Sequence, residues 1–205
     1  MPLVMGLTGG MGVGKSTVAA LLAEGGASVI DVDGVGRDVL EPDGGAYDGV
    51  VATFGSAVLD DDGRIDRAAL AAEVFGGDGR LDDLEAISHP AINAVLAERV
   101  ASAASTVVLD MAVLTESRLG WVGEERLYQR VIVVEAPLEL RIERLAEGRG
   151  VPESDARARI ASQASDHDRR LLADLIITND ADLSALRSEV DRCRPTVAAW
   201  EAQAA

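Results

Sequence analysis

Five short runs of apolar, mostly β-branched residues recur along the chain, and longer stretches with helical periodicity separate them. Apolar runs that lack polar alternation are typical of strands buried on both faces of a parallel sheet. The expected strands are residues 3–8, 28–32, 106–110, 131–135 and 175–178.

The segments between these runs repeat apolar residues three and four positions apart, which predicts helices. The expected helices are residues 16–24, 67–75, 81–104, 138–147, 154–164 and 183–202. Such alternation of strands and helices predicts an α/β fold, a three-layer, doubly wound parallel sheet with helices on both faces.

One long segment interrupts the alternation. About 70 residues between the second and third strands hold helices but no strand, far more than the dozen or so that a crossover needs. We therefore expect a single domain, residues 1–205, with its core at 1–33 and 105–205. A helical insertion is expected at about 34–104, and a short helical lid at about 141–165.

The composition is strongly acidic, with 35 Asp and Glu against 19 Lys and Arg in 205 residues and a formal charge of −16. Such a chain repels nucleic acid, and no apolar run reaches the ~18 residues that span a membrane. The single cysteine, Cys193, cannot form an internal disulfide. We therefore expect a cytoplasmic protein without nucleic-acid or membrane partners; the oligomeric state stays open.

The strongest chemical signal is a glycine-rich stretch, TGGMGVGKST, at residues 8–17. It contains Gly9-x4-Gly14-Lys15-Ser16, the full P-loop pattern, between an expected strand and an expected helix. Glycines let backbone N–H groups close around phosphate oxygens, and the following helix aims its positive dipole end at them. Lysine reaches the β- and γ-phosphates, and the serine hydroxyl ligates Mg²⁺. The predicted nucleotide-phosphate site comprises Gly12, Val13, Gly14, Lys15, Ser16 and Thr17, with Ser16 as the Mg²⁺ ligand.

Lys15 is also the only lysine of the chain, since every other basic residue is arginine. A planar guanidinium does not replace a compact ammonium on a flexible stem. The only lysine therefore stands at the position where phosphate binding requires one. This argues against the alternative that the glycine-rich stretch merely connects a strand to a helix.

The other motifs favour a small-molecule kinase among P-loop proteins. Guanine-specific switches read their base with an Asn-Lys-x-Asp motif, and the chain has no second lysine to supply one. ATP-driven motors usually carry Asp-Glu after an apolar strand, whereas here Asp110 is followed by Met111.

A kinase needs a carboxylate that orients the acceptor, cations that cover the γ-phosphate and a lid that excludes water. Asp31 and Asp33 end the second strand, at the sheet edge where ligands bind in doubly wound folds. One of them is expected to contact an acceptor hydroxyl, although aspartates that merely end a strand form the same pattern. Arg141, Arg144 and Arg149 are the candidate cations after the fourth strand.

Over nearly its whole length the sequence resembles the dephospho-coenzyme A kinase family. The matching strings are GLTGGMGVGKSTVA at 6–19, VIDVDGVGRDVLEPDGGAY at 29–47, RAALAAEVF at 67–75, LEAISHPAI at 84–92, DMAVLTES at 110–117, RIERLAEGRG at 141–150 and RIASQAS…LLADLIITND at 159–180. Many families share the P-loop, but the VIDxD segment, the His89-Pro90 pair and the ADxxIxN string are more particular to this one.

The resemblance implies that ATP phosphorylates the 3′-hydroxyl of dephospho-coenzyme A, the last step of coenzyme A synthesis. It implies that Asp33 acts as general base or orients the hydroxyl, with Lys15 as its catalytic partner. It further implies that the insertion binds the coenzyme A moiety. The implied contacts are Thr8 and His89 on the acceptor side and Arg144, Arg149 and Asn179 at ATP.

Two stretches depart from the family's pattern. Many relatives have Pro-Leu-Leu-x-Glu after the third strand, where this chain has Ala112 to Glu116. The interval between Arg144 and Arg149 is one residue wider than in some relatives. The alternatives are another P-loop small-molecule kinase, acting on a nucleoside, a nucleoside monophosphate or a sugar acid, and a nucleotide-binding regulator that transfers no phosphate.

Overall fold

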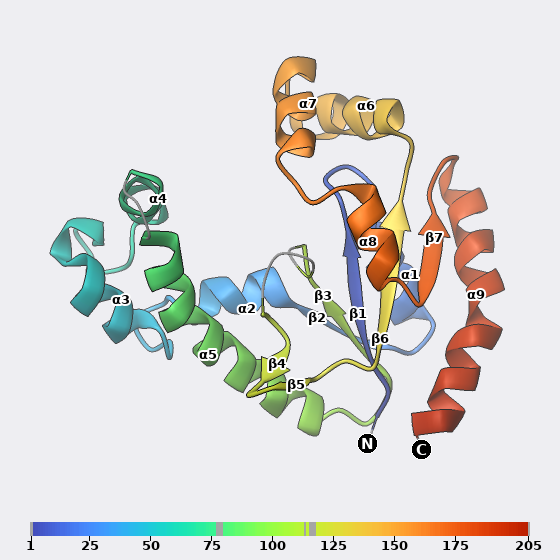
Figure 1. Cartoon of the computed structure of the whole chain (residues 1–205), viewed down its shortest axis with the longest axis horizontal. Helices are drawn as coiled ribbons and strands as arrows, with labels where there is room; N and C mark the ends of the chain where they lie inside the picture. The colour runs from blue at the N-terminus through green and yellow to red at the C-terminus, as the bar shows by residue number, and fades with distance from the viewer. Residues whose placement is uncertain (1, 77–79, 113, 115–117, 205) are drawn as a thin grey trace.

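A parallel five-stranded sheet forms the centre of the molecule (Figure 1). The computed structural model describes residues 2–76, 80–112, 114 and 118–204. The sheet has the strand order β2-β3-β1-β6-β7, and every neighbouring pair is parallel. Its strands are β1 (Val4–Gly9), β2 (Ser28–Asp31), β3 (Val107–Asp110), β6 (Arg130–Glu135) and β7 (Leu175–Thr178). The expected doubly wound parallel sheet is confirmed, since all five predicted strands are present.

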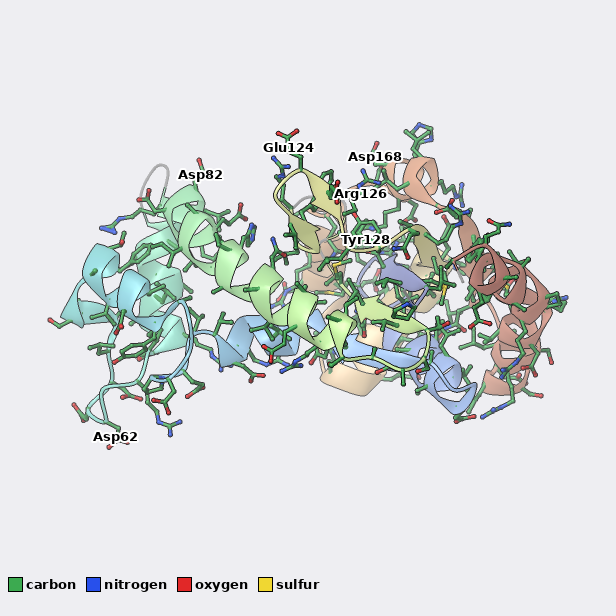
Figure 2. The ribbon with its side chains drawn as sticks, turned by 90° about the horizontal axis from the view of Figure 1, so that it is seen from below. Asp62, Asp82, Glu124, Arg126, Tyr128 and Asp168 are labelled. Carbon is green, nitrogen blue, oxygen red and sulfur yellow. The ribbon has the colours of Figure 1, made fainter. Side chains whose placement is uncertain are left out.

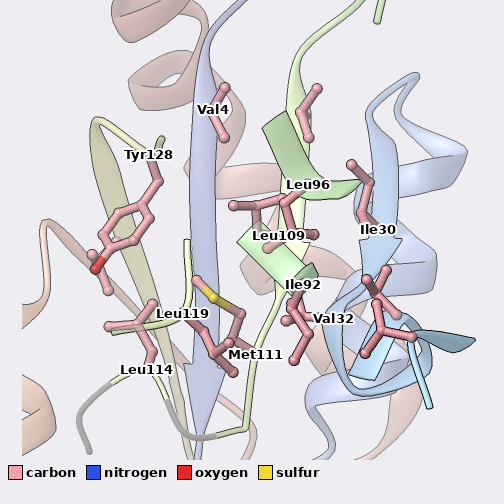
Figure 3. Packing of buried hydrophobic residues seen from close by; sticks show 14 of the residues in the cluster. Val4, Ile30, Val32, Ile92, Leu96, Leu109, Met111, Leu114, Leu119 and Tyr128 are labelled. Atoms are coloured by element: carbon pink, nitrogen blue, oxygen red, sulfur yellow. The ribbon is translucent and has the colours of Figure 1, made fainter. Parts of the chain in front are cut away.

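Helices cover both faces of this sheet and give it three layers. One face carries α2 (Val32–Asp38), α5 (Arg80–Ala101) and α8 (Asp166–Leu172), and the other carries α1 (Lys15–Glu24) and α9 (Leu183–Ala204). Along β6 the side chains alternate between the two cores, with Val131 and Val133 on the first face and Ile132 and Val134 on the second. This alternation explains why the strands are apolar throughout, because each side of every strand meets a helix layer. Figure 3 shows the first core, where Ile92 and Leu96 of α5 pack near Val4 and Leu109 of the sheet.

The segment between β2 and β3 extends to one side of the sheet and carries a small hydrophobic core of its own (Figure 1). Its elements are α3 (Tyr47–Phe54), a 3-10 helix η1 (Ser56–Val58) and α4 (Arg67–Phe75). The long helix α5 joins both regions, because Leu84 and Ile87 pack against this smaller core whereas Ile92 and Leu96 pack against the sheet. The region is therefore fixed to the sheet by a continuous helix.

Two helices, α6 (Leu138–Arg149) and α7 (Glu153–Ala161), lie beyond the carboxyl ends of the strands (Figure 1). They pack against each other through Ile142, Leu145 and Ala156, and Met11 of the glycine-rich loop joins this apolar cluster. The two helices therefore contact the phosphate loop directly.

Two local features differ from the sequence-based expectation. The second strand ends at Asp31 and α2 begins at Val32, so Asp33 lies in the first turn of a helix and not at the end of a strand. A two-stranded hairpin, β4 (Trp121–Val122) and β5 (Glu125–Arg126), was not expected, because strands of two residues are too short to show a periodic pattern.

The outer surface is rich in charged side chains. Figure 2 shows Asp62 and Asp82 projecting from the insertion and Glu124 at the tip of the hairpin. In the ranges that the structure covers, no helix combines the length and apolar content needed to cross a membrane.

Candidate active site

A cavity of about 340 Å³ opens at the carboxyl ends of the strands, above the glycine-rich loop. Loop residues from Gly9 to Ser16 form its floor. Asp33 and Ala112 follow β2 and β3, on one side of β1 in the sheet order. The segment after β6, on the other side of β1, contributes Arg144, Arg149 and Gln163. The structure therefore gathers most of the predicted phosphate and acceptor residues around one cavity.

Glycine is required at two positions of the loop by both conformation and space. Gly12 and Gly14 have φ angles of 80° and 87°, in the left-handed region. A Cβ at Gly12 would lie 2.7 Å from the carbonyl oxygen of Arg141, and one at Gly14 would lie 2.3 Å from Nδ2 of Asn179. Helix α1 begins at Lys15, and none of the described side chains caps its first turn. Its amino end is therefore available to phosphate oxygens.

Carboxylates surround the lysine on the β2–β3 side. The Lys15 ammonium contacts Oδ1 of Asp110 at the end of β3. Burial raises the pKa of the Asp33 carboxyl above its ordinary value; Lys15 opposes this rise, and the nearby Asp31 and Asp110 carboxylates add to it. Asp31 is exposed and pairs with Arg37 at 2.9 Å. Of the two aspartates of the VIDVD segment, only Asp33 lines the cavity.

The opposite side of the cavity carries two guanidinium groups, and a residue that follows the last strand of the sheet positions one of them. Arg144 donates from Nη1 to the carbonyl oxygen of Asn179 at 3.2 Å and from Nη2 to its Oδ1 at 3.1 Å. The Asn179 amide is buried and donates from Nδ2 to the carbonyl oxygen of Val13 at 2.8 Å. One asparagine after β7 thus connects the phosphate loop to the cavity arginine. Arg149, the last residue of α6, also lines the cavity.

Arg141 has a different location from its two neighbours on α6. Its side chain is only 3% exposed, and it donates from Nε to the carbonyl oxygen of Met11 at 2.9 Å and from Nη1 to Asp166 at 3.3 Å. A Cβ at Gly10 would lie 2.3 Å from its Nη2, so a larger residue there would displace this guanidinium. Burial lowers the pKa of this guanidinium, and Asp166 opposes the change. Arg141 therefore fastens α6 to the loop and does not line the cavity.

Several predicted site residues lie away from the cavity. Thr8 is fully buried on β1, and its hydroxyl has no hydrogen-bond partner within the part of the chain that the structure describes. Val13 turns its side chain into the core beside α1, and Thr17 follows in the first turn of that helix. His89 lies on α5 and lines a separate space of about 340 Å³ against the β4–β5 hairpin. Glu116 falls outside the described residues.

A metal ion would find few side-chain ligands here. No cluster of three or more His, Cys, Asp or Glu side chains suited to a metal occurs among the described residues. The cavity offers the exposed hydroxyl of Ser16 next to Lys15. This donor set fits Mg²⁺ that arrives with a nucleotide, because Mg²⁺ prefers phosphate oxygens and water and needs only one or two protein oxygens.

Sequence reasoning did not single out two contributors to the site. Gln163 lines the cavity and accepts a hydrogen bond from Met11, and Asp110 holds Lys15. Gln163 stands in a string that matches the family, RIASQAS, but nothing in its spacing connects it to a loop 152 positions earlier. From the sequence, Asp110 at the end of an apolar strand fits equally a residue that holds Mg²⁺ through water and one that merely starts a loop, and neither reading predicts its contact with Lys15.

Comparisons with known proteins place the chain in a family. A sequence model of the family described as dephospho-CoA kinase matches residues 3–185. A dephospho-CoA kinase from Thermobifida fusca (strain YX) is 43% identical over 190 residues, which cover 92% of each chain. The crystal structure of TT1252 from Thermus thermophilus is similar with a TM-score of 0.80 and 33% identity, over 97% of both chains. A dephospho-CoA kinase from Campylobacter jejuni shares the fold with a TM-score of 0.70 at 24% identity, over 96% of this chain and 98% of that one. The chain belongs to the dephospho-CoA kinase family.

Proposed function

We propose that this chain uses ATP to phosphorylate the 3′-hydroxyl of dephospho-coenzyme A, giving coenzyme A and ADP, in the cavity that Lys15 and Asp33 share. The observation that carries this proposal is the presence of the Asp33 carboxylate in the lining of a cavity whose floor is a P-loop. Membership of the family supports the identity of the acceptor.

In this proposal Asp33 orients the acceptor hydroxyl and takes its proton as the oxygen attacks the γ-phosphorus. Its raised pKa makes it a better proton acceptor than an ordinary aspartate, although most of the gain comes from alignment of the attacking oxygen. The bond between the γ-phosphorus and the β–γ bridging oxygen breaks, and ADP leaves with that oxygen.

The phosphates of ATP would lie along Gly12, Val13 and Gly14, which lead into the amino end of α1. Lys15 would leave Asp110 and bind the β- and γ-phosphates, and Thr17 would contact the α-phosphate. An anionic ligand of this charge offers the ammonium a stronger partner than one carboxylate does.

We propose that Arg144 and Arg149 stabilise the negative charge that develops on the transferred phosphoryl group, because both line the cavity opposite Asp33. Asn179 acts partly by position, since its amide donates one hydrogen to Val13 and accepts a hydrogen bond from Arg144, and the second hydrogen of its Nδ2 remains for the adenine. Ser16 would hold Mg²⁺, which would neutralise part of the phosphate charge.

The remaining assignments concern the acceptor. We propose that residues of about 34–104 bind the coenzyme A moiety, with His89 at the base of that region and Thr8 beneath the acceptor site. Residues of about 141–165 act as a lid. This lid would move about the part of α6 that Arg141 fastens to the phosphate loop. Cys193, a free buried thiol, and the use of ATP support a cytoplasmic location.

An acceptor panel tests the proposal. The purified protein is assayed for ADP release with Mg²⁺·ATP and, separately, dephospho-coenzyme A, a nucleoside, a nucleoside monophosphate and gluconate. We expect turnover with dephospho-coenzyme A to exceed that with every other acceptor by at least about 100-fold in kcat/KM, a ratio that corresponds to about 2.7 kcal/mol. Preferred turnover of another acceptor, or slow hydrolysis that no acceptor accelerates, would contradict the proposal.

A further inference from the structure

Gln163 occupies an unusual place between the lid helices and the phosphate loop. It follows α7, lines the phosphate cavity with Lys15 and Asp33, and accepts a hydrogen bond at Oε1 from the backbone N–H of Met11 at 2.8 Å. Its own backbone N–H bonds to the carbonyl oxygen of Ile160, which fixes the start of the side chain. A residue of the lid region thus reaches the floor of the cavity.

The orientation of the Gln163 amide follows from its partner. A backbone N–H only donates, so the atom that faces Met11 must be the amide oxygen, and the reversed amide would set donor against donor. The Met11 peptide is itself held, because its carbonyl oxygen accepts from Nε of Arg141 at 2.9 Å. The amide nitrogen of Gln163 therefore has a defined position beside the loop.

That nitrogen carries two N–H donors, and within the described ranges it has no protein partner. The α- and β-phosphates of a nucleotide lie over the end of the loop that enters α1, so the γ-phosphoryl group lies toward Gly10 and Met11. Gln163 is hydrogen-bonded to Met11, so its side chain lies on the side of the loop where the γ-phosphoryl group is expected.

We infer that Gln163 binds the γ-phosphoryl group of ATP through its side-chain amide nitrogen and so distinguishes ATP from ADP. This inference rests on the proposed function and adds a specific contact to it. The contact differs from those of Lys15 and the cavity arginines because it is neutral and directional. It also adds, only when the γ-phosphoryl group is present, a link through the nucleotide to the existing bond between Gln163 and the loop.

The decisive variant is Gln163→Glu. A glutamate keeps an acceptor for the Met11 N–H, so a purely structural role predicts that the affinities for AMPPNP and ADP change by the same factor. A γ-phosphate contact predicts the opposite, because the two donors become an anionic oxygen that faces phosphate. Affinities for the non-hydrolysable ATP analogue AMPPNP and for ADP are measured by calorimetry with Mg²⁺ and without acceptor, so the outcome does not depend on the acceptor's identity.

The matched control is Gln129→Glu. Gln129 also accepts a backbone hydrogen bond at Oε1, from Val4 at 2.8 Å, but it is exposed and far from the cavity at the amino end of β6. Thermal melting of both variants reports whether the fold is intact. Gln163→Ala serves as a second variant that removes the donors without adding charge.

We expect Gln163→Glu to weaken AMPPNP binding by about 100-fold and ADP binding by less than about threefold, and Gln163→Ala to weaken AMPPNP binding by about tenfold. In turnover assays both variants should lose kcat as well as ATP affinity, since the contact persists in the transition state. An unchanged ratio of AMPPNP to ADP affinity in Gln163→Glu overturns the inference, as does a change confined to the KM of dephospho-coenzyme A. Failure of the wild-type protein to phosphorylate dephospho-coenzyme A would instead contradict the proposed function and leave the affinity ratio as the test of Gln163.

Discussion

The two sides of the phosphate cavity carry opposite charge. On the side of β2 and β3, the carboxylates of Asp33 and Asp110 lie near Lys15. On the side of β6 and β7, Arg144 and Arg149 line the cavity. In a chain with a formal charge of −16, binding of ATP therefore depends on cations that the fold gathers at one place and not on the charge of the whole surface.

The two sides also differ in how the fold holds them. Asp33 lies in the first turn of α2, whose Val32 and Val35 are buried in the main core. Arg144 instead depends on hydrogen bonds to Asn179. We therefore expect changes on the carboxylate side to act on the chemical step, and changes on the arginine side to act mainly on ATP binding.

The largest effect is expected for Lys15→Arg. The guanidinium is larger and planar, so it cannot exchange Asp110 for the β- and γ-phosphates in the same space as the compact ammonium. We expect kcat to fall by about 1,000-fold, measured by steady-state ADP release. Arg187→Lys is the control, because this exposed residue pairs with Glu24 at 2.5 Å on the surface and its change should leave kcat within about twofold. Near-normal turnover in Lys15→Arg would show that the ammonium is not specifically required.

The second largest effect is expected for Asp33→Asn. The amide cannot accept the hydroxyl proton, so kcat should fall by about 100-fold while the Kd for AMPPNP changes by less than about threefold. Asp31→Asn is the matched control, since Asp31 belongs to the same segment but pairs with Arg37 and does not line the cavity. If the two variants lose equal activity, Asp33 has no special role and the contrast between the two sides of the cavity is lost.

The shifted pKa of Asp33 also predicts how Asp33→Asn changes the melting temperature of the protein. Burial raises the pKa of Asp33, so the folded protein binds this proton more tightly than the unfolded chain does. Between the ordinary and the raised pKa, the group lowers stability as pH increases, and the full penalty applies above the raised pKa. Asp33→Asn should therefore raise the melting temperature at neutral pH and have no such effect at pH values below the ordinary pKa of aspartate. A lower melting temperature at neutral pH would show that the charged form is stabilised in the fold.

The smallest effect on turnover is expected for Asn179→Ala. Removal of the amide leaves the buried carbonyl oxygen of Val13 without its partner and costs about 1–3 kcal/mol of stability. It also removes the hydrogen bond from Arg144 to the Asn179 side chain, so the guanidinium is less well positioned. The KM for ATP should therefore rise about fivefold while kcat stays within about twofold.

Asn93→Ala provides the comparison for that variant. Asn93 likewise joins two segments, accepting from the N–H of Gly120 at 2.8 Å and donating to the carbonyl oxygen of Arg118 at 3.2 Å, but it lies outside the phosphate cavity. It should lose stability without a change in the KM for ATP. An equal rise in that KM for both variants would mean that general destabilisation explains the result.

The sequence-based expectation was most accurate where a local pattern decides the structure. The five apolar runs correspond to the five strands of the sheet, and the P-loop motif predicts the floor of the cavity and the start of α1 near Lys15. It failed at Val32, where an apolar residue after a strand starts a helix, because a helix of seven residues is too short to show a clear periodic signal.

The sequence also did not show which arginine of α6 reaches the cavity. Arg141 and Arg144 stand three residues apart on one helix and looked equivalent as phosphate ligands. The structure buries Arg141 against Met11 and Asp166 and leaves Arg144 in the cavity. Which arginine meets the nucleotide depends on the position of α6 against the loop, a contact between segments 130 positions apart in the chain.

The sequence by itself determined the fold class, the phosphate loop and the family, because strand burial, glycine conformations and the lone Lys15 are local properties that a pattern of residues displays. Only the tertiary structure decided that Asp33 shares a cavity with Lys15 and that Asp110, Asn179 and Gln163 support the loop. These relations arise where the carboxyl ends of separate strands meet at one edge of the sheet. Their distances therefore follow from the packing of the sheet and its helices and not from spacing along the chain.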